Sequence, residues 1–531
     1  MFTLLKPDFL VADNSLYFIV LSFIALLYLL IRQRIVNQRR NPRGLPLPPG
    51  PKGLPFVGKL FDRPIEKPWL IYDGWAKTYG DMVYFEVLGQ PFLILGSLKR
   101  VNDLLEKRSS NYSDRVRMPM VLELMEWGFN MAMLPYGSWW RRHRRSFNEH
   151  FHQNTVYKYQ PAQAHEVKEF LNRLLTTPDN FMHHIRHTFA ATIMSVAYGI
   201  SVKESQDPYI SRAEESLEGL AIAGVPGTFL VDFIPALMYV PSWFPGASFK
   251  RKAEHWRKIN NDLSEIPFRQ VEEQMKLGKA PPSLAATLIE RLPPKDDPSY
   301  YEERTIAKHN AAVTYVAGAD TTVSSVQTFF LAMALYPEVQ KKAQAELDRV
   351  IGPNRLPEFG DREALPYINA LVKETSRWNL VIPLAVGHMA SADDEYDGYF
   401  IPKGTIVMGN AWAILHDPTV YADPMEYVPE RYLKDGQLDP DVINPDCAAF
   451  GFGRRKCPGR HMSDNSLYSI ISSTLAVYDI KAPVDEKGRP VKLEAEFTSG
   501  LLSYPAPFKC NITPRSRTAE ALIRDSAKLG Q

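Results

Sequence analysis

One cysteine in a glycine-rich loop carries the strongest chemical signal of this sequence. Cys457 lies near the end of the stretch F-G-F-G-R-R-K-C-P-G, residues 450–459. Gly453 and Gly459 let the backbone approach a flat group closely, and Arg455 presents a planar fork that fits a carboxylate. Phe450 can shield the sulfur from water, and the helical pattern after the loop favours negative charge at its N-terminus. The loop therefore indicates a thiolate ligand, whereas a lone cysteine is more often a buried structural residue.

An acid and two hydroxyl groups inside a long helical run form a second candidate site. The run covers residues 305–335 and ends before Pro337, which stops helices. Its stretch A-G-A-D-T-T, residues 317–322, is poor helix-forming material apart from the alanines. Asp320 and Thr321 indicate a widened turn that directs a hydroxyl and a water toward a ligand. The alternative is a helix kink caused by packing.

Two further motifs combine charged and aromatic residues. Glu374 and Arg377 share one helix face because they are three residues apart, and the stretch Y-V-P-E-R-Y follows at residues 427–432. Taken alone, such a pair is an ordinary surface ion pair. The stretch G-S-W-W-R-R-H-R-R, residues 137–145, is most simply a solvated basic helix face.

The pattern F-x-x-G-x-R-x-C-x-G resembles the haem-binding signature of the cytochrome P-450 superfamily of haem-thiolate proteins. The other motifs are similar to that family's W-x-x-x-R, A-G-x-D-T-T, E-x-x-R and P-E-R-F elements, in the same order, and Tyr432 replaces the phenylalanine of the last. The resemblance extends to roughly Arg515, nearly the whole chain. It implies a mainly α fold with small β-sheets, one large catalytic domain and a haem b cofactor.

The resemblance also implies a role for each residue of these motifs. Cys457 is the axial iron ligand, which favours O–O cleavage. Thr321 hydrogen-bonds to the oxygen that is activated, and Asp320 helps to relay the two protons that the chemistry needs. The implied haem contacts are Trp140, Arg144, His388, Phe450, Gly453, Arg455 and Gly459. A buried structural triad of Glu374, Arg377 and Arg431 braces the cysteine loop. A lone histidine such as His388 is, on the residues alone, more often a packing residue.

The implied reaction is R–H + O₂ + two electrons + two protons, giving R–OH and water, with the chemistry carried by the haem. The implied electron donor is NADPH-cytochrome P-450 reductase, with cytochrome b5 as a second donor. The predicted docking face for an acidic partner consists of Arg141, Arg142, Arg144, Arg145, Arg454 and Lys456. Alternatively, several of these residues pair with the haem or solubilise the surface.

The expected substrate is a small, largely apolar molecule. Stretches at residues 104–108 and 241–246 look like fungal members that serve secondary metabolism, so a terpenoid, indole or polyketide intermediate is expected. Predicted substrate contacts lie at residues 118–133, 221–227, 381–386 and 498–502. The alternatives are a haem-thiolate isomerase or peroxygenase without a reductase, and a non-catalytic haem-binding sensor. The pair Asp320 and Thr321 argues against both.

An apolar run near the N-terminus predicts a membrane anchor. Residues 15–31 carry no charge, and five arginines follow within residues 32–43, which favours a cytosolic body. A cleaved signal peptide would place the charge before the apolar run. The protein is therefore expected in the endoplasmic reticulum membrane as a single-pass protein with a cytosolic catalytic domain. The sequons at Asn111 and Asn511 should then stay bare. The net charge of +2 offers no argument for nucleic acid, and no such partner is expected.

The chain is expected to consist of four parts. They are an anchor segment at residues 1–31, a basic and proline-rich hinge at 32–55, the catalytic domain at 56–515 and a tail at 516–531. Helical periodicity is clearest at residues 166–175, 184–198, 253–275, 305–335 and 338–350. Hairpins are predicted at residues 82–95, 399–407 and 496–508. The apolar segment Val225 to Phe249 is either a membrane-interface surface or a buried connection.

Overall fold

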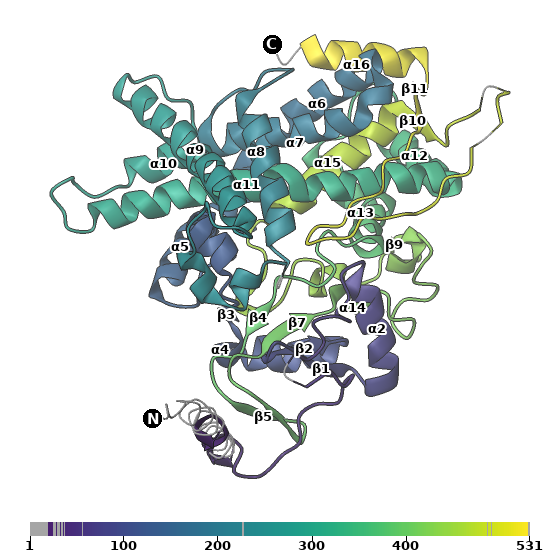
Figure 1. The fold of residues 1–531 in the computed structure, drawn as a ribbon. Coiled ribbons are helices and arrows are strands. Elements are labelled where there is room, and N and C mark those ends of the chain that lie inside the picture. The colour runs from purple at the N-terminus through teal and green to yellow at the C-terminus, as the bar shows by residue number, and fades with distance from the viewer. Residues whose placement is uncertain are drawn as a thin grey trace, which may run out of the picture.

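The computed structural model describes residues 20–24, 28, 32, 35–36, 38–55, 57–225, 228–485, 487–489 and 491–528. In this part of the chain, helices form most of the body and small sheets lie at its periphery (Figure 1). The predicted mainly α fold with small β-sheets is therefore confirmed.

The helical core is built from long helices joined by short turns. The α-helices are α2 Pro68–Tyr79, α3 Leu98–Val101, α4 Ser109–Tyr112, α5 Ser138–Phe151, α6 Gln160–Thr176, α7 Phe181–Tyr198, α8 Pro208–Ala223, α9 Ser248–Lys276, α10 Leu284–Glu290, α11 Tyr300–Leu335, α12 Pro337–Val350, α13 Pro366–Trp378, α14 Ala411–Leu415, α15 Arg460–Val477 and α16 Arg517–Lys528. The short 3-10 and π turns are η1 Asn102–Lys107, η2 Met120–Leu124, η3 Trp127–Phe129, η4 Val156–Tyr159, η5 Pro178–Asn180, η6 Leu230–Asp232, η7 Pro235–Tyr239, η8 Phe359–Ala364, η9 Pro429–Tyr432, η10 Pro445–Cys447 and η11 Gly453–Arg455. Each of the five predicted helical stretches lies in one of these helices, from α6 to α12.

The 36-residue helix α11 runs through the centre of the body (Figure 1). Its buried residues lie on all of its faces, because α5, α7, α9 and α15 pack around it. Gly318 permits the closest of these approaches, since a Cβ there would lie 2.7 Å from the side chain of Ile193 on α7. Helix α11 ends at Leu335, and Pro337 opens α12. The central helix thus carries the A-G-A-D-T-T stretch through the core.

The main sheet has the strand order β1-β2-β7-β4-β3. Its strands are β1 Met82–Val87, β2 Gln90–Leu95, β3 Asp114–Arg115, β4 His388–Met389 and β7 Ile406–Gly409; the smaller pairs are β5 Asp394–Tyr396 with β6 Tyr399–Ile401, β8 Leu433–Lys434 with β9 Gln437–Leu438, and β10 Tyr478–Lys481 with β11 Asn511–Pro514. The antiparallel pairing of β1 with β2 confirms the first predicted hairpin.

The prediction of a hairpin at residues 399–407 is wrong. Strand β6 pairs with β5, and β7 pairs in parallel with β2. The turn at Pro402 to Gly404 carries the chain from one sheet to another, so the two strands never face each other. At residues 496–508 the expected hairpin reduces to one antiparallel bridge between Phe497 and Pro505.

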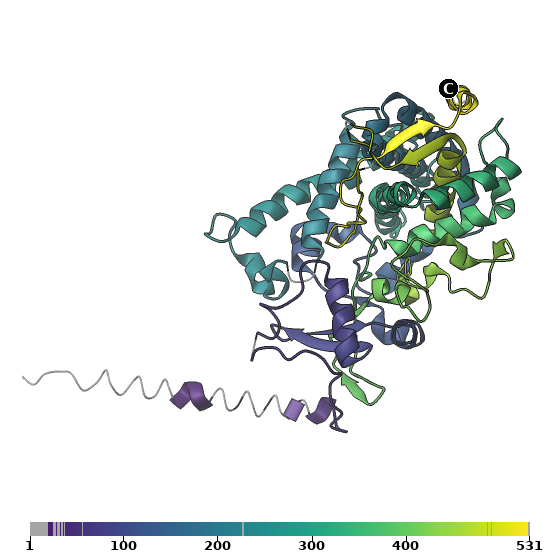
Figure 2. The ribbon, with the colours of Figure 1, turned by 90° about the vertical axis from the view of Figure 1, so that its right-hand side faces the viewer.

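The predicted anchor at residues 15–31 lies mostly outside the described residues. Among the residues that are described, none of the helices combines the length and apolarity that crossing a membrane requires. The following segment contacts the body: Arg40 pairs with Asp393 at 2.5 Å, and Arg43 pairs with Glu395 at 2.7 Å. These contacts attach the hinge segment beside the β5–β6 hairpin, at the lower edge of the body in Figure 2.

Candidate active site

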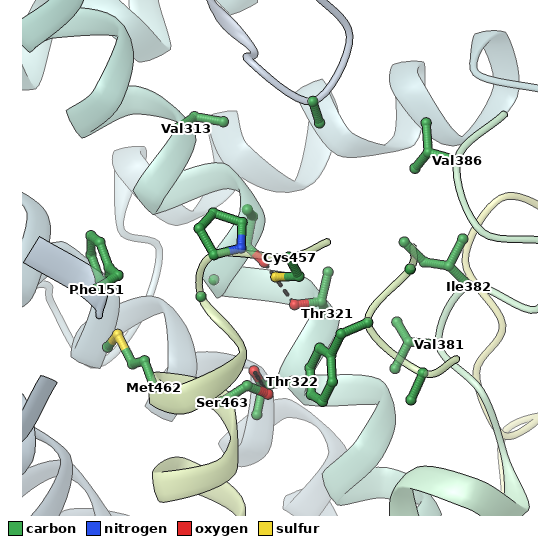
Figure 3. A pocket seen from close by; sticks show the side chains of 18 of the residues that line it. Phe151, Val313, Thr321, Thr322, Val381, Ile382, Val386, Cys457, Met462 and Ser463 are labelled. Atoms are coloured by element: carbon green, nitrogen blue, oxygen red, sulfur yellow. Dashed lines mark hydrogen bonds between the residues drawn. The ribbon is translucent and has the colours of Figure 1, made fainter. Parts of the chain in front are cut away.

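A cavity of about 310 Å³ lies between the cysteine loop and the central helix. Cys457 lies close to the start of α15, and Thr321 belongs to α11 on the facing wall (Figure 3). Phe151 and Met462 line one end of the cavity, and Ile382 lines the other. The residues that the sequence singled out and that line this cavity are Trp140, Arg144, Thr321, His388, Phe450, Arg455, Cys457 and Gly459.

The cysteine loop holds its thiol by backbone geometry. The amide N–H of Cys457 donates to the carbonyl oxygen of Phe450 at 2.8 Å, which closes the loop. Burial raises the pKa of the Cys457 thiol, whereas the backbone N–H of Gly459 and the charges of Arg144 and Arg460 act in the opposite direction. The thiol is thus enclosed and faces a set of positive groups, as a thiolate ligand requires.

Gly453 does not line the cavity, unlike the other glycine of the motif. Its φ is +58°, and a Cβ at this position would lie 2.1 Å from the carbonyl oxygen of Leu105. The N–H of Gly453 donates to Glu106 at 3.0 Å. The residue therefore lets the loop approach η1 closely, and its expected contact with a cofactor is replaced by this packing role.

Three guanidinium groups line the same cavity; those of Arg115 and Arg455 are buried and that of Arg144 is partly buried. Arg455 donates to the carbonyl oxygens of Ser113 and Leu134, both at 2.8 Å. Arg115 donates to the carbonyl oxygen of Ala132 at 2.8 Å, as well as to those of residues 386 and 387. Arg144 donates to the carbonyl oxygen of residue 456 at 2.5 Å. In the part of the chain that the structure describes, each group is held by backbone carbonyls and not by a carboxylate.

This cluster has the electrostatics of a site for an acidic group. Burial lowers the pKa of Arg455 to about 10. Burial and the charge of Arg455 together lower the pKa of Arg115. Burying positive charge without a partner is costly, so a bound molecule with carboxylates would relieve the repulsion. The two propionates of a haem meet this requirement, and the residues present therefore fit that cofactor.

Trp140 and His388 complete the basic wall. The guanidinium of Arg455 lies over the Trp140 ring, 4.4 Å from its centroid. His388 is held through Nδ1 by the carbonyl oxygen of Tyr112 at 2.6 Å, and burial lowers the pKa of its ring, which favours the neutral form. Arg115 was missed by the sequence interpretation. The pairing of β3 with β4 places Arg115 opposite His388, and this long-range pairing has no local sequence signal.

The two residues of the acid–hydroxyl motif face different spaces. The hydroxyl of Thr321 donates to the carbonyl oxygen of Ala317 at 2.7 Å, and both residues line the cysteine cavity. Asp320 lines a second cavity of about 350 Å³ instead. Its carboxylate accepts hydrogen bonds from Arg186 at 2.8 Å and from the phenol of Tyr504. The main chain of α11 thus separates the predicted proton carrier from the predicted oxygen contact.

The three residues of the predicted triad lie in contact beneath the cysteine loop. The guanidinium of Arg377 binds both carboxylate oxygens of Glu374, at 2.7 and 2.8 Å, and both side chains are fully buried. Arg431 donates to the same carboxylate at 3.2 Å. Arg377 also donates to the carbonyl oxygens of residues 415, 424 and 426, so it ties α13 to the chain that leads into the cysteine loop.

The remaining walls of the cavity are mainly apolar, with scattered hydroxyl and amide side chains and no acidic one among the described residues. Two of the predicted substrate segments line it, through residues 130–132 and through residues 381, 382, 385 and 386. A small neighbouring cavity is lined by residues 224, 225, 500 and 501 from the other two segments. The sequence interpretation missed the contributions of α5, α7 and the part of α11 before its motif, which are Phe147, Phe151, Phe189, Thr192, Ile193, Val313 and Thr314. Their helical periodicity was visible, but not which face would meet the cavity.

The predicted docking face is smaller than expected. Arg142 pairs with Glu302 and Glu303 at 2.5 and 2.8 Å, and Arg144 points into the cavity. Arg141, Arg145 and Arg454 stay exposed. With the partly exposed Lys456, these residues form the remaining basic surface on the cysteine side of the molecule.

Comparisons with known proteins agree with this geometry. Residues 48–511 match the family model described as Cytochrome P450. A cytochrome P450 monooxygenase named COX2 from Coprinopsis cinerea is 50% identical over 92% of this chain and 92% of its own length. Tryptamine 4-monooxygenase of Psilocybe cyanescens is 42% identical, over 91% and 95% respectively. The cytochrome P450 monooxygenase claR of Ampulloclitocybe clavipes is also 42% identical, over 92% and 89%. With its enclosed cysteine, its basic cavity wall and these relatives, the chain belongs to the cytochrome P450 family.

Proposed function

We propose that this cytochrome P450 monooxygenase inserts one oxygen atom into an uncharged, largely apolar small molecule of fungal secondary metabolism. The observation that carries the proposal is the lining of the cysteine cavity, where apolar walls from α7, α11 and residues 381–386 meet no aspartate or glutamate among the described residues. An ammonium ion buried there would find no carboxylate partner, which is strongly unfavourable.

The haem is expected to bind between Cys457 and α11. Cys457 would supply the thiolate ligand, and Arg115, Arg144, Arg455 and Trp140 would hold the propionates. When bound, the haem supplies the activation of O₂. The chain would supply the rest: the mainly apolar walls would orient the substrate and exclude water. The hydroxyl of Thr321, which donates to the carbonyl oxygen of Ala317 in this structure, would have to turn into the cavity to donate there.

Charge selectivity separates this chain from one of its relatives. Tryptamine 4-monooxygenase carries in its name a substrate with an ammonium group at neutral pH. The lining of the present cavity has no acidic side chain in the part that the structure describes, and its three guanidinium groups are the ones expected to pair with the propionates. We therefore propose that neutral ring systems, such as terpenoid hydrocarbons or unsubstituted indoles, enter the cavity and that amines are rejected.

Binding spectra of the purified, haem-loaded protein test this substrate class. The neutral compound is 3-propylindole, which has the ring of tryptamine and a side chain of the same length with a methyl group in place of the ammonium, so the pair isolates the effect of the charge. The neutral compound should shift the Soret band at a concentration at least about tenfold lower, since an unpaired buried charge costs well over 1.4 kcal/mol. Equal affinity for tryptamine would contradict the proposal.

We further propose that the electrons come from an NADPH-dependent flavoprotein reductase, with cytochrome b5 as a second donor. The exposed Arg141, Arg145 and Arg454 would attract an acidic partner to the cysteine side. Product formation should require both NADPH and the reductase, and it should fall at high ionic strength. Full turnover without a reductase would favour the isomerase or peroxygenase alternative.

A membrane location is proposed on the composition of residues 15–31 and on one exposed surface. The apolar composition of the segment Val225 to Phe249 fits either a membrane-interface surface or a buried connection. Several of its large apolar side chains are exposed, with Tyr239 at 84% and Trp243 at 77%, while Val231 and Ala247 are buried. The exposed side chains favour contact with the membrane interface. Fractionation of the expressed protein should place it with endoplasmic reticulum membranes, with Asn111 and Asn511 unglycosylated. A glycosidase-sensitive mass shift would reverse the topology.

A further inference from the structure

Asp320 lines the second cavity, here called the outer cavity, which lies on the other side of α11 from Cys457. This outer cavity lies between α7, α8, α11 and the C-terminal turn at residues 498–504. Its polar lining consists of Arg186, Glu214, Glu218, Asp320 and Tyr504, and most of the remaining residues are apolar. Thr321, the next residue along the helix, lines the cysteine cavity instead. Residues 320 and 321 therefore connect the two spaces through the wall of α11.

Two donors fix the carboxylate of Asp320 toward the outer cavity. Arg186 donates to Oδ1 at 2.8 Å, and the phenol of Tyr504 donates to Oδ2. The guanidinium of Arg186 also lies 5.5 Å from the centroid of the Tyr504 ring. Each carboxylate oxygen of Asp320 has its own donor, so the carboxylate has a defined orientation.

Hydrogen bonds within the C-terminal turn, to α11 and to residue 381 hold Tyr504 in place. The N–H of Thr498 donates to the carbonyl oxygen of Tyr504 at 2.8 Å, and the N–H of Tyr504 returns to the Thr498 hydroxyl at 3.0 Å. Ser324, one helical turn after Asp320 on α11, donates to the carbonyl oxygen of Ser503 at 2.5 Å. The N–H of Ser503 donates to Val381, a wall residue of the cysteine cavity, at 2.9 Å. The phenol is therefore part of the wall and not a freely rotating surface group.

The rim of the outer cavity is acidic. Glu214 and Glu218 are four residues apart, so they lie on the same face of α8, and both are exposed. Together with Asp320 they set three carboxylates against the single guanidinium of Arg186 in the cavity lining. Such a rim raises the local concentration of cations, including protons, at the mouth of the cavity.

We propose that Tyr504 is a positioning residue for proton delivery: its phenol orients Asp320 and links that carboxylate to water in the acidic outer cavity. This inference rests on the proposed function, in which R–H + O₂ + NADPH + H⁺ gives R–OH + H₂O + NADP⁺. Two protons leave in the water for each substrate molecule oxidised. When protons arrive too slowly, the same electrons leave as hydrogen peroxide, by O₂ + NADPH + H⁺ giving H₂O₂ + NADP⁺.

The variant Tyr504→Phe tests the proposal by removing only the hydroxyl. The fraction of NADPH recovered as product should fall about fivefold to tenfold and peroxide should rise to match, less than the 100-fold or more expected for loss of a proton donor itself. The substrate concentration that half-saturates the Soret shift should stay within twofold, because Tyr504 does not line the substrate cavity. Tyr84→Phe is the matched control, since it removes a phenol–carboxylate hydrogen bond of 2.6 Å to Glu86 in the main sheet.

A second readout needs no turnover. Infrared difference spectra against Asp320→Asn identify the carboxylate band of Asp320 in the resting, haem-loaded protein. That band should shift in Tyr504→Phe and stay in place in Tyr84→Phe. If Tyr504→Phe fails to take up haem, Arg186→Gln removes the other donor and should produce the same loss of product yield.

An unshifted infrared band would overturn the inference, as would a product yield within twofold of the wild type. A loss of substrate affinity as large as the loss of yield would also overturn it, because the turn would then be a structural support only. If the wild-type protein forms no product with NADPH and reductase, the proposed function fails, whereas the infrared band still decides whether Tyr504 orients Asp320.

Discussion

Arg115, Arg144 and Arg455 are three cations of the cavity wall that form no ion pair with a carboxylate among the described residues. Arg115 is the most informative, since its neighbours in the sequence give no hint of a role and only the pairing of β3 with β4 brings it to the cavity. The positive charges of Arg115 and Arg455 repel each other, and the carboxylates of a bound cofactor would reduce this repulsion. Individual substitutions can therefore separate residues that hold the cofactor from residues that merely pack.

Cys457→Ala should abolish the red-shifted Soret band of the reduced, carbon monoxide-bound protein. The band requires a thiolate ligand, and the other two cysteines, Cys447 and Cys510, do not line the cavity. Absorption spectra of the reduced protein with carbon monoxide provide the measurement, and Cys447→Ala is the matched control. A surviving band in Cys457→Ala would show that the ligand is another residue.

Arg115→Gln should accelerate haem loss about 10- to 100-fold, because one charged hydrogen bond to a buried propionate contributes roughly 1.5–3 kcal/mol. Transfer of haem to an excess of apomyoglobin measures the rate. Arg117→Gln is the control, since Arg117 is exposed and pairs with Glu123 on the surface. Equal rates in the two variants would remove Arg115 from the cofactor site.

At the scale of elements, the chain that leads to the cysteine loop is held by α13, a helix that ends 72 residues before the loop begins. The buried carboxylate of Glu374 on α13 binds two guanidinium groups, and Arg377 reaches the carbonyl oxygens that precede the loop. Sequence spacing correctly indicated that Glu374 and Arg377 share a helix face. Whether that face would be buried was not visible locally, because an exposed pair has the same spacing.

Glu374→Gln should destabilise the protein by about 3–5 kcal/mol, since two buried guanidinium groups lose their counter-charge. Chemical denaturation followed by circular dichroism gives the free energy of unfolding. Asp361→Asn breaks the partly exposed pair with Arg355 and should cost at most about 1 kcal/mol. Similar losses in the two variants would mean that burial adds nothing to the triad.

Strand partners were the least predictable elements. The β1–β2 hairpin has a short turn, so its pairing is local and could be predicted. The strand at residues 406–409 pairs with β2, which is far away in sequence, and not with its sequence neighbour at residues 399–401. Likewise, the helices around the cavity were expected from their periodicity, but their cavity-facing residues depend on how α7 packs against α11 at Gly318. The sequence motifs could therefore identify the thiolate site, whereas the residues that line the cavity around it depend on how the helices pack.

At the scale of the whole molecule, buried histidines couple stability to pH. His416 lies against Trp412, and burial lowers its pKa from the ordinary 6.5 to about 3. In the unfolded chain it binds a proton below pH 6.5, whereas in the folded chain it does not. Its contribution to stability is therefore present above pH 6.5 and is lost as the pH falls toward the folded value.

His416→Gln should consequently flatten the decline of stability between pH 6.5 and 4. The comparison with wild type matters, because burial raises the pKa of Glu166 to about 7 and this group acts in the opposite direction. Denaturant midpoints at several pH values measure the difference. A wild-type and a variant curve that run parallel across this range would show that His416 titrates normally.

The ion pairs of Arg40 and Arg43 with the β5–β6 hairpin have a practical consequence for shortening the chain. Asp393, Asp394 and Glu395 stand side by side in that hairpin, and truncation beyond residue 43 would strip two of them of their counter-ions. A recombinant version without the apolar run should therefore begin before Arg40. The boundary of the folding unit then lies inside the segment that composition alone assigns to a linker.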